Sequence, residues 1–373
     1  MEFTIERSEF LKALQRVISV VPTKTTKEIL YDVLLIAEDG TLKIIATDLD
    51  ITQIAWAQAQ VSEEGAVAVL GKLLLDILRE MPEIELKFHV EENYRVTLET
   101  SMGHYKLVGE PRNEFPSVPM VEKEYSITLP NDKMKRMIER TIFACSTEPA
   151  RPALTGVLCQ IYEDEYRMVA TDGHRLVRFI NKNFKNPGFT KQYIVPTKAL
   201  NFVARNLPED GEHQIFISSQ HILFELPNTK IYSRLITDPY PDYERVIPDY
   251  FQKEMIINRE ELIHSVKRVS LFANPMTYQI RLQLNPDNVI ISAQDIDFGG
   301  EASETIPCRF DYEPLLIAYN ANYLLDLLRH MDAEQIRIMV EDADGPGLLF
   351  PLEQEKDEDI LMLIMPVRLS ETD

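Results

Sequence analysis

The segment Met168-Val169-Ala170-Thr171-Asp172 repeats an earlier stretch of the chain that reads Ile44-Ile45-Ala46-Thr47-Asp48. A third, weaker copy reads Ile290-Ile291-Ser292-Ala293-Gln294. Thr171 lies 124 residues after Thr47, and Ala293 lies 122 residues after Thr171. Because similarity at a fixed spacing is the mark of a repeated structural unit, the 373-residue chain is predicted to contain three copies of one unit.

Two helical segments recur with the same spacing. Apolar residues at i, i+3, i+4 and i+7, such as Leu11, Leu14 and Ile18, predict helices with one buried face. The first type of helix is expected at 9–20, 132–143 and 259–272, with Arg16, Arg140 and Arg268 in matching places. The second type is expected at 71–81, 197–207 and 320–331, with Arg79, Arg205 and Arg329 in matching places.

Short β-rich segments separate these helices. In the first third we expect strands at 2–6, 31–37, 41–47, 52–61, 66–70, 84–90, 94–100 and 104–109. Alternation of apolar and polar residues, as in 94–99, is typical of half-buried antiparallel strands. The order strand, helix, three strands therefore occurs twice in each third, and the predicted fold class is α+β.

Proline-rich seams divide the chain near 114–124 and 238–252. Proline ends strands and stiffens linkers, and a chain of this length is too long for one compact core. We therefore expect three domains, at 1–121, 122–248 and 249–373.

The composition excludes several classes of protein. No run of eighteen apolar residues is present, and the first residues are charged and alternating, so neither a transmembrane helix nor a targeting peptide is expected. Cys145, Cys159 and Cys308 lack zinc-site spacing and are expected to be buried free thiols in a reducing cytoplasm. We expect no metal and no cofactor.

Several motifs occur in a fixed order along the chain. Thr171-Asp172-Gly173-His174-Arg175-Leu176 lies in the middle third, Tyr240-Pro241-Asp242-Tyr243 opens the second seam, and Met365-Pro366-Val367-Arg368-Leu369 lies close to the last residue. Phe115-Pro116, Arg245 to Pro248, and Asn320 with Tyr323 complete the set. In this order and on this repeat, the whole chain resembles the bacterial DNA polymerase III beta subunits, the beta sliding clamps.

That resemblance implies a clamp fold and a function. Each domain would be a pair of strand–helix–three-strand halves, with helices lining a ring and antiparallel sheets outside. Two chains would join head to tail around duplex DNA, without reading its sequence. As a non-catalytic subunit of a DNA-directed DNA polymerase holoenzyme, the ring would tether the polymerase III catalytic subunit. It would also bind the clamp loader, other DNA polymerases and repair proteins through short linear motifs.

The net charge of −21 at first argues against a nucleic-acid partner. The six helical segments, with the first counted from Phe10 to Val20, nevertheless carry a net charge of +7, so the remainder of the chain carries −28. Cations gathered on the elements that would line the hole favour a positive lumen inside an acidic shell. The plainer interpretation is that Lys and Arg are good helix formers on solvated faces.

The resemblance also implies which residues would form each site. The peptide-binding groove would consist of Leu154, Thr171, Gly173, His174, Arg175, Leu176, Pro241, Arg245, Val246, Tyr278, Asn320, Tyr323, Leu363, Met365, Pro366, Val367, Arg368 and Leu369. DNA contacts would come from Lys24, Lys72, Arg151 and Lys198. The dimer interface would use Tyr105 and Leu107 on one chain and Phe272 and Ala273 on the other. Glu148, Pro152 and Ala153 depart from the polar and aromatic residues that some relatives place in their DNA-contacting loop.

Two other functions are compatible with parts of the sequence. One is a repeat-built scaffold that binds peptides but does not encircle DNA. The other is an enzyme that uses Asp172 and His174, although no G-x-S-x-G, P-loop or H-E-x-x-H motif accompanies them. A turn at Asp172-Gly173 between two strands is the simpler interpretation of the same residues. The acidic loop from Glu353 to Asp359 and the tail from Ser370 to Asp373 have no predicted role.

Overall fold

The structure is a computed structural model that describes residues 1–185, 188–295 and 299–368. The chain divides into two compact units. The first comprises Met1–Lys135 and Lys198–Leu235, and the second comprises Arg136–Thr197 and Ile236–Asp373. No helix in the described part of the chain combines the length and apolar character needed to span a bilayer.

The first unit is built on one antiparallel sheet of 13 strands in the order β10-β15-β16-β17-β4-β3-β2-β6-β9-β8-β7-β1-β5. Its strands are β1 (Glu2–Glu6), β2 (Asp32–Glu38), β3 (Thr41–Thr47), β4 (Ile51–Gln58), β5 (Gln60–Glu63), β6 (Gly65–Leu70), β7 (Glu85–Val90), β8 (Arg95–Thr100), β9 (Gly103–Glu110), β10 (Tyr125–Pro130), β15 (Glu212–Ile217), β16 (His221–Leu226) and β17 (Thr229–Arg234).

The second unit has a sheet of 12 strands in the order β14-β11-β12-β13-β25-β24-β23-β18-β21-β20-β19-β22. Its strands are β11 (Gly156–Ile161), β12 (Tyr166–Thr171), β13 (Arg175–Asn181), β14 (Lys191–Pro196), β18 (Lys253–Asn258), β19 (Gln279–Leu284), β20 (Asn288–Asp295), β21 (Gly300–Arg309), β22 (Leu315–Asn320), β23 (Gln335–Val340), β24 (Gly347–Pro351) and β25 (Glu358–Ile364).

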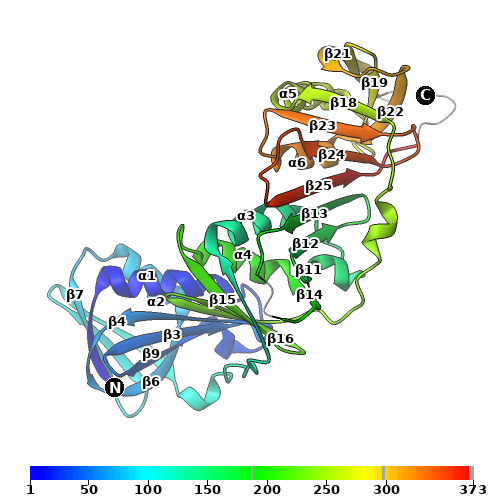
Figure 1. The fold of residues 1–373 in the computed structure, drawn as a ribbon. Helices are drawn as coiled ribbons and strands as arrows, with labels where there is room; N and C mark the ends of the chain where they lie inside the picture. Colours follow the sequence, from blue (N-terminus) through cyan, green and yellow to red (C-terminus); the bar gives the residue numbers. More distant parts are fainter. Residues whose placement is uncertain (186–187, 296–298, 369–373) are drawn as a thin grey trace. The chain divides into compact units, whose positions relative to one another are not determined.

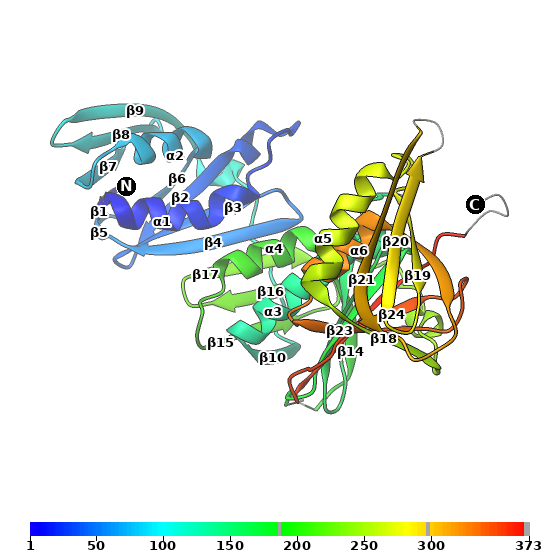
Figure 2. The same ribbon diagram turned by 90° about the horizontal axis from the view of Figure 1, so that it is seen from above.

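The six predicted helices are confirmed. They are α1 (Arg7–Val17), α2 (Gly71–Glu80), α3 (Asn131–Thr141), α4 (Thr197–Asn206), α5 (Arg259–Val269) and α6 (Ala321–Arg329). In the first unit α1 and α2 lie side by side against the sheet, and in the second α5 and α6 form the corresponding pair (Figure 1 and Figure 2). Their apolar faces are fully buried: Phe10 and Leu14 of α1 and Leu324 and Leu328 of α6 each expose 1% or less. This burial is the main stabilising term for short helices.

Continuous sheets cross both predicted domain seams. In the first unit β17 pairs with β4 from Thr229↔Ala55 to Ser233↔Ile51. In the second unit β13 pairs with β25 from Arg175↔Ile364 to Asn181↔Glu358. Two different parts of the segment predicted as the middle domain therefore belong to different compact units.

Three local expectations differ from the structure. The strand expected at 52–61 ends at Gln58, because the Ala59 amide bonds to the Gly40 carbonyl and β5 then pairs with β1. All three cysteines are free, but only Cys145 and Cys159 are buried, whereas Cys308 is half-buried. The acidic loop is shorter than expected, because β25 begins at Glu358. The Glu358 carboxylate is buried there and accepts a hydrogen bond from Arg136.

Candidate functional site

The turn between β12 and β13 is held by the side chains of its own first two residues. The Thr171 hydroxyl donates to the Arg175 carbonyl at 2.7 Å and accepts from the Gly173 amide at 3.0 Å. The Asp172 carboxylate accepts from the amides of His174 and Arg175 at 2.9 and 3.0 Å. Gly173 has φ +92°, a value that glycine adopts without strain. The predicted turn is confirmed, and it leaves the Gly173 and His174 side exposed.

The repeated segment of the first unit folds in the same way. The Thr47 hydroxyl donates to the Ile51 carbonyl at 3.0 Å, and Asp48 accepts from the amides of Asp50 and Ile51 at 3.1 and 2.7 Å. Leu49 stands in the place of Gly173 and has φ +81°, which costs a leucine conformational energy. The sequence repeat therefore reproduces an atomic pattern of hydrogen bonds, and glycine makes the second copy the less strained one.

Arg175 ties this turn to a helix and a loop of the second unit. Its guanidinium donates to Asp172 at 3.1 Å, to Asp326 of α6 at 2.7 Å and to the Phe143 carbonyl at 3.0 Å. The ring of Tyr323 lies 5.0 Å from its central carbon. Only 8% of Arg175 is exposed. Three of its N–H donors are thus used within the chain, where Arg175 positions the turn.

An aromatic wall stands beside the turn. The rings of His174 and Tyr323 stack with centroids 5.5 Å apart and planes 16° from parallel. Asn320 caps α6 by accepting from the amides of Asn322 and Tyr323, which fixes the start of the helix. Partial burial, with the Asp172 carboxylate as a second cause, raises the pKa of Tyr323. Tyr323 is therefore a neutral phenol at physiological pH and offers an apolar face with a polar tip.

Tyr278 continues this wall from the other side of Asn320. The side-chain Nδ2 of Asn320 donates to the Thr277 carbonyl at 2.9 Å, and the backbone amide of Ala321 donates to the Tyr278 carbonyl at 2.8 Å. Tyr278 has φ +49° and exposes 40% of its surface. A positive φ is unfavourable for a tyrosine, so the surrounding structure must hold Tyr278 in this conformation. Strained residues of this kind are often found at functional sites.

The segment after β25 runs along the same turn. The Met365 amide donates to the His174 carbonyl at 2.8 Å, and the Val367 amide donates to the Ala318 carbonyl at 2.8 Å. Met365 exposes 38% of its surface, so its thioether side chain is available on the outside. Leu363 and Leu176 belong to one buried apolar cluster of the same unit. Leu369 lies outside the described residues.

The remaining groove candidates come from the seam at 240–246 and from Leu154. Val246 is 47% exposed, Pro241 is exposed, and Leu154 is buried. Arg245 is exposed and pairs with Asp242 at 2.7 Å. All described groove candidates belong to the second unit, and some are buried, some half-buried and some exposed. The exposed set is Gly173, His174, Pro241, Arg245, Val246, Tyr278, Met365 and Arg368.

Two of the four candidate DNA-binding cations already have carboxylate partners. Lys24 and Lys72 are exposed, but Lys198 forms an ion pair with Asp48 within the first unit. Arg151 lies 3.6 Å from the Glu148 carboxylate. A Cβ atom at Gly173 would be 3.2 Å from its guanidinium, so Arg151 lies against the β12–β13 turn.

Several other helix cations are also neutralised locally. Arg136 and Arg140 both pair with Asp332, and Arg268 pairs with Glu304 at 2.6 Å. The net charge of +7 counted for the helical segments alone therefore overstates the positive field, because acids outside the helices lie against their cations.

The interface candidates lie on an open strand edge and a helix end. Tyr105 is 40% exposed and Leu107 is half-buried on β9, whose pairing with β6 is confined to Gly109 and Glu110. Phe272 follows α5 and is 43% exposed, whereas Ala273 is 8% exposed.

Sequence reasoning missed three residues that shape these sites. Asp326 and Phe143 anchor Arg175, and Asp48 neutralises Lys198. An acid on a helix or a phenylalanine carbonyl carries no sequence signal for such a contact. Asp48 is the repeat counterpart of Asp172, but its cation comes from α4, and the repeat does not predict that contact.

The comparisons with known proteins agree over the whole chain. Models of the DNA polymerase III beta subunit match residues 1–119 (N-terminal domain), 128–242 (central domain) and 244–368 (C-terminal domain). The beta sliding clamp of Pseudomonas aeruginosa is 31% identical over 373 residues, covering 99% of this chain and 100% of that protein. That of Chlamydia trachomatis is 29% identical, covering 99% and 87%.

Solved structures give the same result. A Pseudomonas aeruginosa sliding clamp bound to griselimycin superposes with a TM-score of 0.94 at 30% identity, covering 99% of this chain and 100% of that one. The Bacillus subtilis clamp also gives 0.94, at 27% identity and the same coverage.

Proposed function

The chain belongs to the DNA polymerase III beta subunit family, the beta sliding clamps, and on that premise we propose that two copies close into a ring that encircles duplex DNA. The protein is a DNA sliding clamp. The match of the family models to all three segments of the chain is the observation that carries the proposal. Heterologous contacts between copies of a chain form rings when the rotation closes, and the exposed edge of β9 and the exposed Phe272 are suited to such a contact.

The groove is proposed to bind short apolar motifs of partner proteins. Met365, Val246 and Tyr278 are exposed apolar side chains of the second unit, and Arg175 anchors the β12–β13 turn of the same unit. A rigid site with an adaptable methionine suits several related peptides, since less conformational entropy is lost on binding. The polymerase III catalytic subunit, the clamp loader, other polymerases and repair proteins are the proposed partners.

The subunit is proposed to be non-catalytic. The Asp172 carboxylate is occupied by two backbone amides and by Arg175, and the His174 ring stacks on Tyr323. An acid and an imidazole committed in this way are poorly arranged to act as a general base with a nucleophile. These contacts support the turn interpretation over the enzyme.

DNA contact is proposed to be electrostatic and independent of sequence. Lys24 and Lys72 are exposed cations that can reach phosphates, which position a duplex without reading its bases. Because such contacts are weak at physiological salt, the closed ring rather than affinity would keep the protein on DNA.

Retention on circular DNA tests this function. The protein is loaded onto nicked circular DNA by its clamp loader and passed through a gel-filtration column before and after one linearising cut. We expect it to elute with the circle at moderate salt and to separate from the linear DNA, because a ring slides off a free end. Equal retention on both forms would favour the peptide-binding scaffold that does not encircle DNA.

A further inference from the structure

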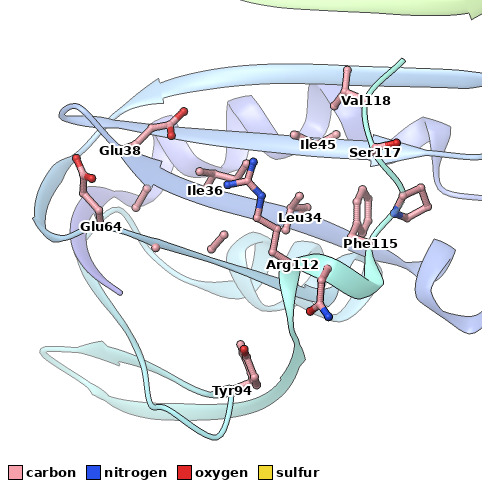
Figure 3. A pocket seen from close by; sticks show the side chains of 15 residues that line it. Leu34, Ile36, Glu38, Ile45, Glu64, Tyr94, Arg112, Phe115, Ser117 and Val118 are labelled. Carbon is pink, nitrogen blue, oxygen red and sulfur yellow. The ribbon is translucent and has the colours of Figure 1, made fainter. Parts of the chain in front are cut away.

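A pocket of about 930 Å³ opens on the first unit, whereas the groove candidates belong to the second. Its apolar floor is made by Leu34, Ile36 and Ile45 on β2 and β3, and Phe115 covers one end (Figure 3). Arg112 extends across the floor, and Glu38 and Glu64 stand at the far rim (Figure 3). The volume lies in the range of pockets that bind ligands in proteins.

The second unit contains the same surface with an occupant. The linker Tyr240-Pro241-Asp242-Tyr243 corresponds to Phe115-Pro116-Ser117-Val118 in the first. Leu158 pairs with Val169 across β11 and β12, as Leu34 pairs with Ile45 across β2 and β3. Tyr243 packs on Leu158 and Val169 and is only 5% exposed.

Polar contacts hold the Tyr243 side chain in its seat. Its hydroxyl donates to Gln160 at 2.8 Å and accepts from Arg167 at 3.3 Å. The next residue of the linker, Glu244, accepts a hydrogen bond from the same arginine at 2.8 Å. In the second unit, this surface is therefore covered by a tyrosine and the acidic residue that follows it, both from the linker of the same chain.

The first unit has the corresponding apolar surface, but its linker has no tyrosine to cover it. Val118 stands where Tyr243 stands in the second unit, and Ile36 replaces Gln160 at the matching position of the strand. Lys43 occupies the place of Arg167 but is paired with Glu38 at 2.7 Å. Within the described residues, no hydrogen bond or ion pair joins the Arg112 guanidinium to another group, although Arg112 adds to the effect of Lys43 in lowering the pKa of Glu38. Arg112 therefore extends over the apolar floor without the ion pair that Arg167 forms with Glu244.

We propose that this pocket binds, from a partner protein, a short segment with a tyrosine followed by an acidic residue. The phenol ring would lie on Leu34 and Ile45, as Tyr243 lies on Leu158 and Val169. The acid would pair with Arg112 and supply the charge that Glu244 supplies to Arg167, a contact that is strong when bidentate. A single aromatic anchor in a preformed seat is a common way to bind a short peptide.

The test uses a peptide copied from the second unit. Fluorescein-labelled Tyr-Pro-Asp-Tyr-Glu is titrated with the full-length protein, and anisotropy is followed. We expect saturable binding of one peptide per chain, with a Kd on the order of 10⁻⁵ to 10⁻⁴ M. Peptides with the second tyrosine changed to alanine, or with the final glutamate changed to lysine, should bind at least tenfold more weakly.

Variants of the protein locate the binding. Val118→Tyr with Ile36→Gln rebuilds the occupied seat of the second unit and should weaken peptide binding at least tenfold, whereas Val118→Ala should not. Arg112→Glu should weaken it as strongly, and Arg112→Lys by less. Met365→Ala, in the groove, should leave this affinity unchanged.

Three outcomes would overturn the proposal. They are no binding up to millimolar protein, binding that survives Val118→Tyr with Ile36→Gln, and binding that is lost with Met365→Ala. Retention of the Val118→Tyr, Ile36→Gln variant on circular DNA should equal that of the wild type. The two functions are thereby tested separately.

Discussion

Arg175 connects three parts of the second unit through Asp172, Asp326 and the Phe143 carbonyl. Arg175→Ala would leave the Asp172 carboxylate without its cation and Asp326 with Arg329 alone, and the unfolding free energy of this unit should fall by about 3 kcal/mol. Arg175→Lys should recover only part of this loss, because an ammonium group cannot reproduce the fork of the guanidinium.

Hydrogen exchange measures this effect unit by unit. Amides of β13 and β25 should lose protection in Arg175→Ala, while fluorescence of Trp56 in the first unit serves as the control. Unchanged protection in β13 would mean that the turn is held by Thr171 and Asp172 without the arginine.

Met365 is the exposed apolar side chain closest in sequence to the end of β25. If it is a central contact of the groove, Met365→Ala should cost about 1–3 kcal/mol of affinity for the clamp-binding peptide of the polymerase III catalytic subunit. Calorimetry on the full chain measures this. Met120→Ala, at a residue 94% exposed on a linker, is the matched control, and equal affinities for both variants and the wild type would refute the assignment.

His213 makes the stability of the first unit depend on pH. Burial lowers the pKa of His213 from 6.5 to about 4. As pH falls, the unfolded chain therefore binds a proton at His213 before the folded chain does. The stability that the neutral His213 provides is fully present above pH 6.5 and is lost as pH falls toward 4. Between pH 7 and pH 5 the unfolding free energy should fall by about 2 kcal/mol from this group.

Urea denaturation followed by Trp56 fluorescence measures this dependence, since both residues belong to the first unit. His213→Gln keeps a polar side chain near Asn131 and should flatten the profile over this pH range. Parallel profiles for the two proteins would show that His213 does not titrate as its burial requires.

The sequence predicts the role of a residue well where that role depends on a local sequence pattern. Thr171 and Asp172 were expected in a turn and are found there, because Asp-Gly between strands has few alternatives. The contact between Lys198 and Asp48 joins residues 150 apart in sequence, and no periodicity reveals it. Long-range ion pairs depend on how elements pack, which a single sequence does not specify.

At the scale of elements, the helices were predicted to within a few residues and the strands less well. Helix α2 occupies Gly71–Glu80 where 71–81 was expected, because its apolar face follows one period along its whole length. The strand expected at 52–61 is interrupted at Ala59, where alternation continues but the pairing partner changes from β3 to β1. Periodicity reports the side-chain faces of a strand, not its neighbour.

The exposed edge of β9 and the end of α5 are the predicted contact surfaces of the dimer. Phe272→Ala with Leu107→Ala should shift the solution mass from two chains toward one, because both side chains would be buried in the proposed interface. Analytical ultracentrifugation at several concentrations measures the shift. Val246→Ala removes an exposed apolar residue of the groove and should stay dimeric, and a double variant as dimeric as the wild type would show that the interface lies elsewhere.

At the scale of the whole molecule, an acidic chain can bind DNA only if its positive charges lie where the DNA passes. The chain carries a net charge of −21, and Asp332, Glu304 and Asp48 neutralise several helix cations. A weakly positive lumen suits a protein that must slide, since strong phosphate contacts would slow it. Retention would then come from ring closure rather than from charge.

Charge reversal of Lys24 and Lys198 separates these two contributions. Lys24→Glu with Lys198→Glu should weaken direct binding of a labelled duplex and slow loading, yet leave the dimer intact. Lys24 is exposed without a recorded partner in the described chain, whereas Lys198 is paired with Asp48. Lys24→Glu alone should therefore cost more affinity than Lys198→Glu, and Asp48→Asn, which frees Lys198, should strengthen binding.

The dependence of binding on salt identifies the contacts that are lost. Each phosphate contact removed should lower the slope of log affinity against log salt by about 1, as measured by anisotropy between low and moderate salt. Retention of the loaded protein on circular DNA should respond little to the same substitutions, because a closed ring cannot leave a circle. If the double variant falls off circles as fast as it loses direct affinity, charge and not topology holds the protein on DNA.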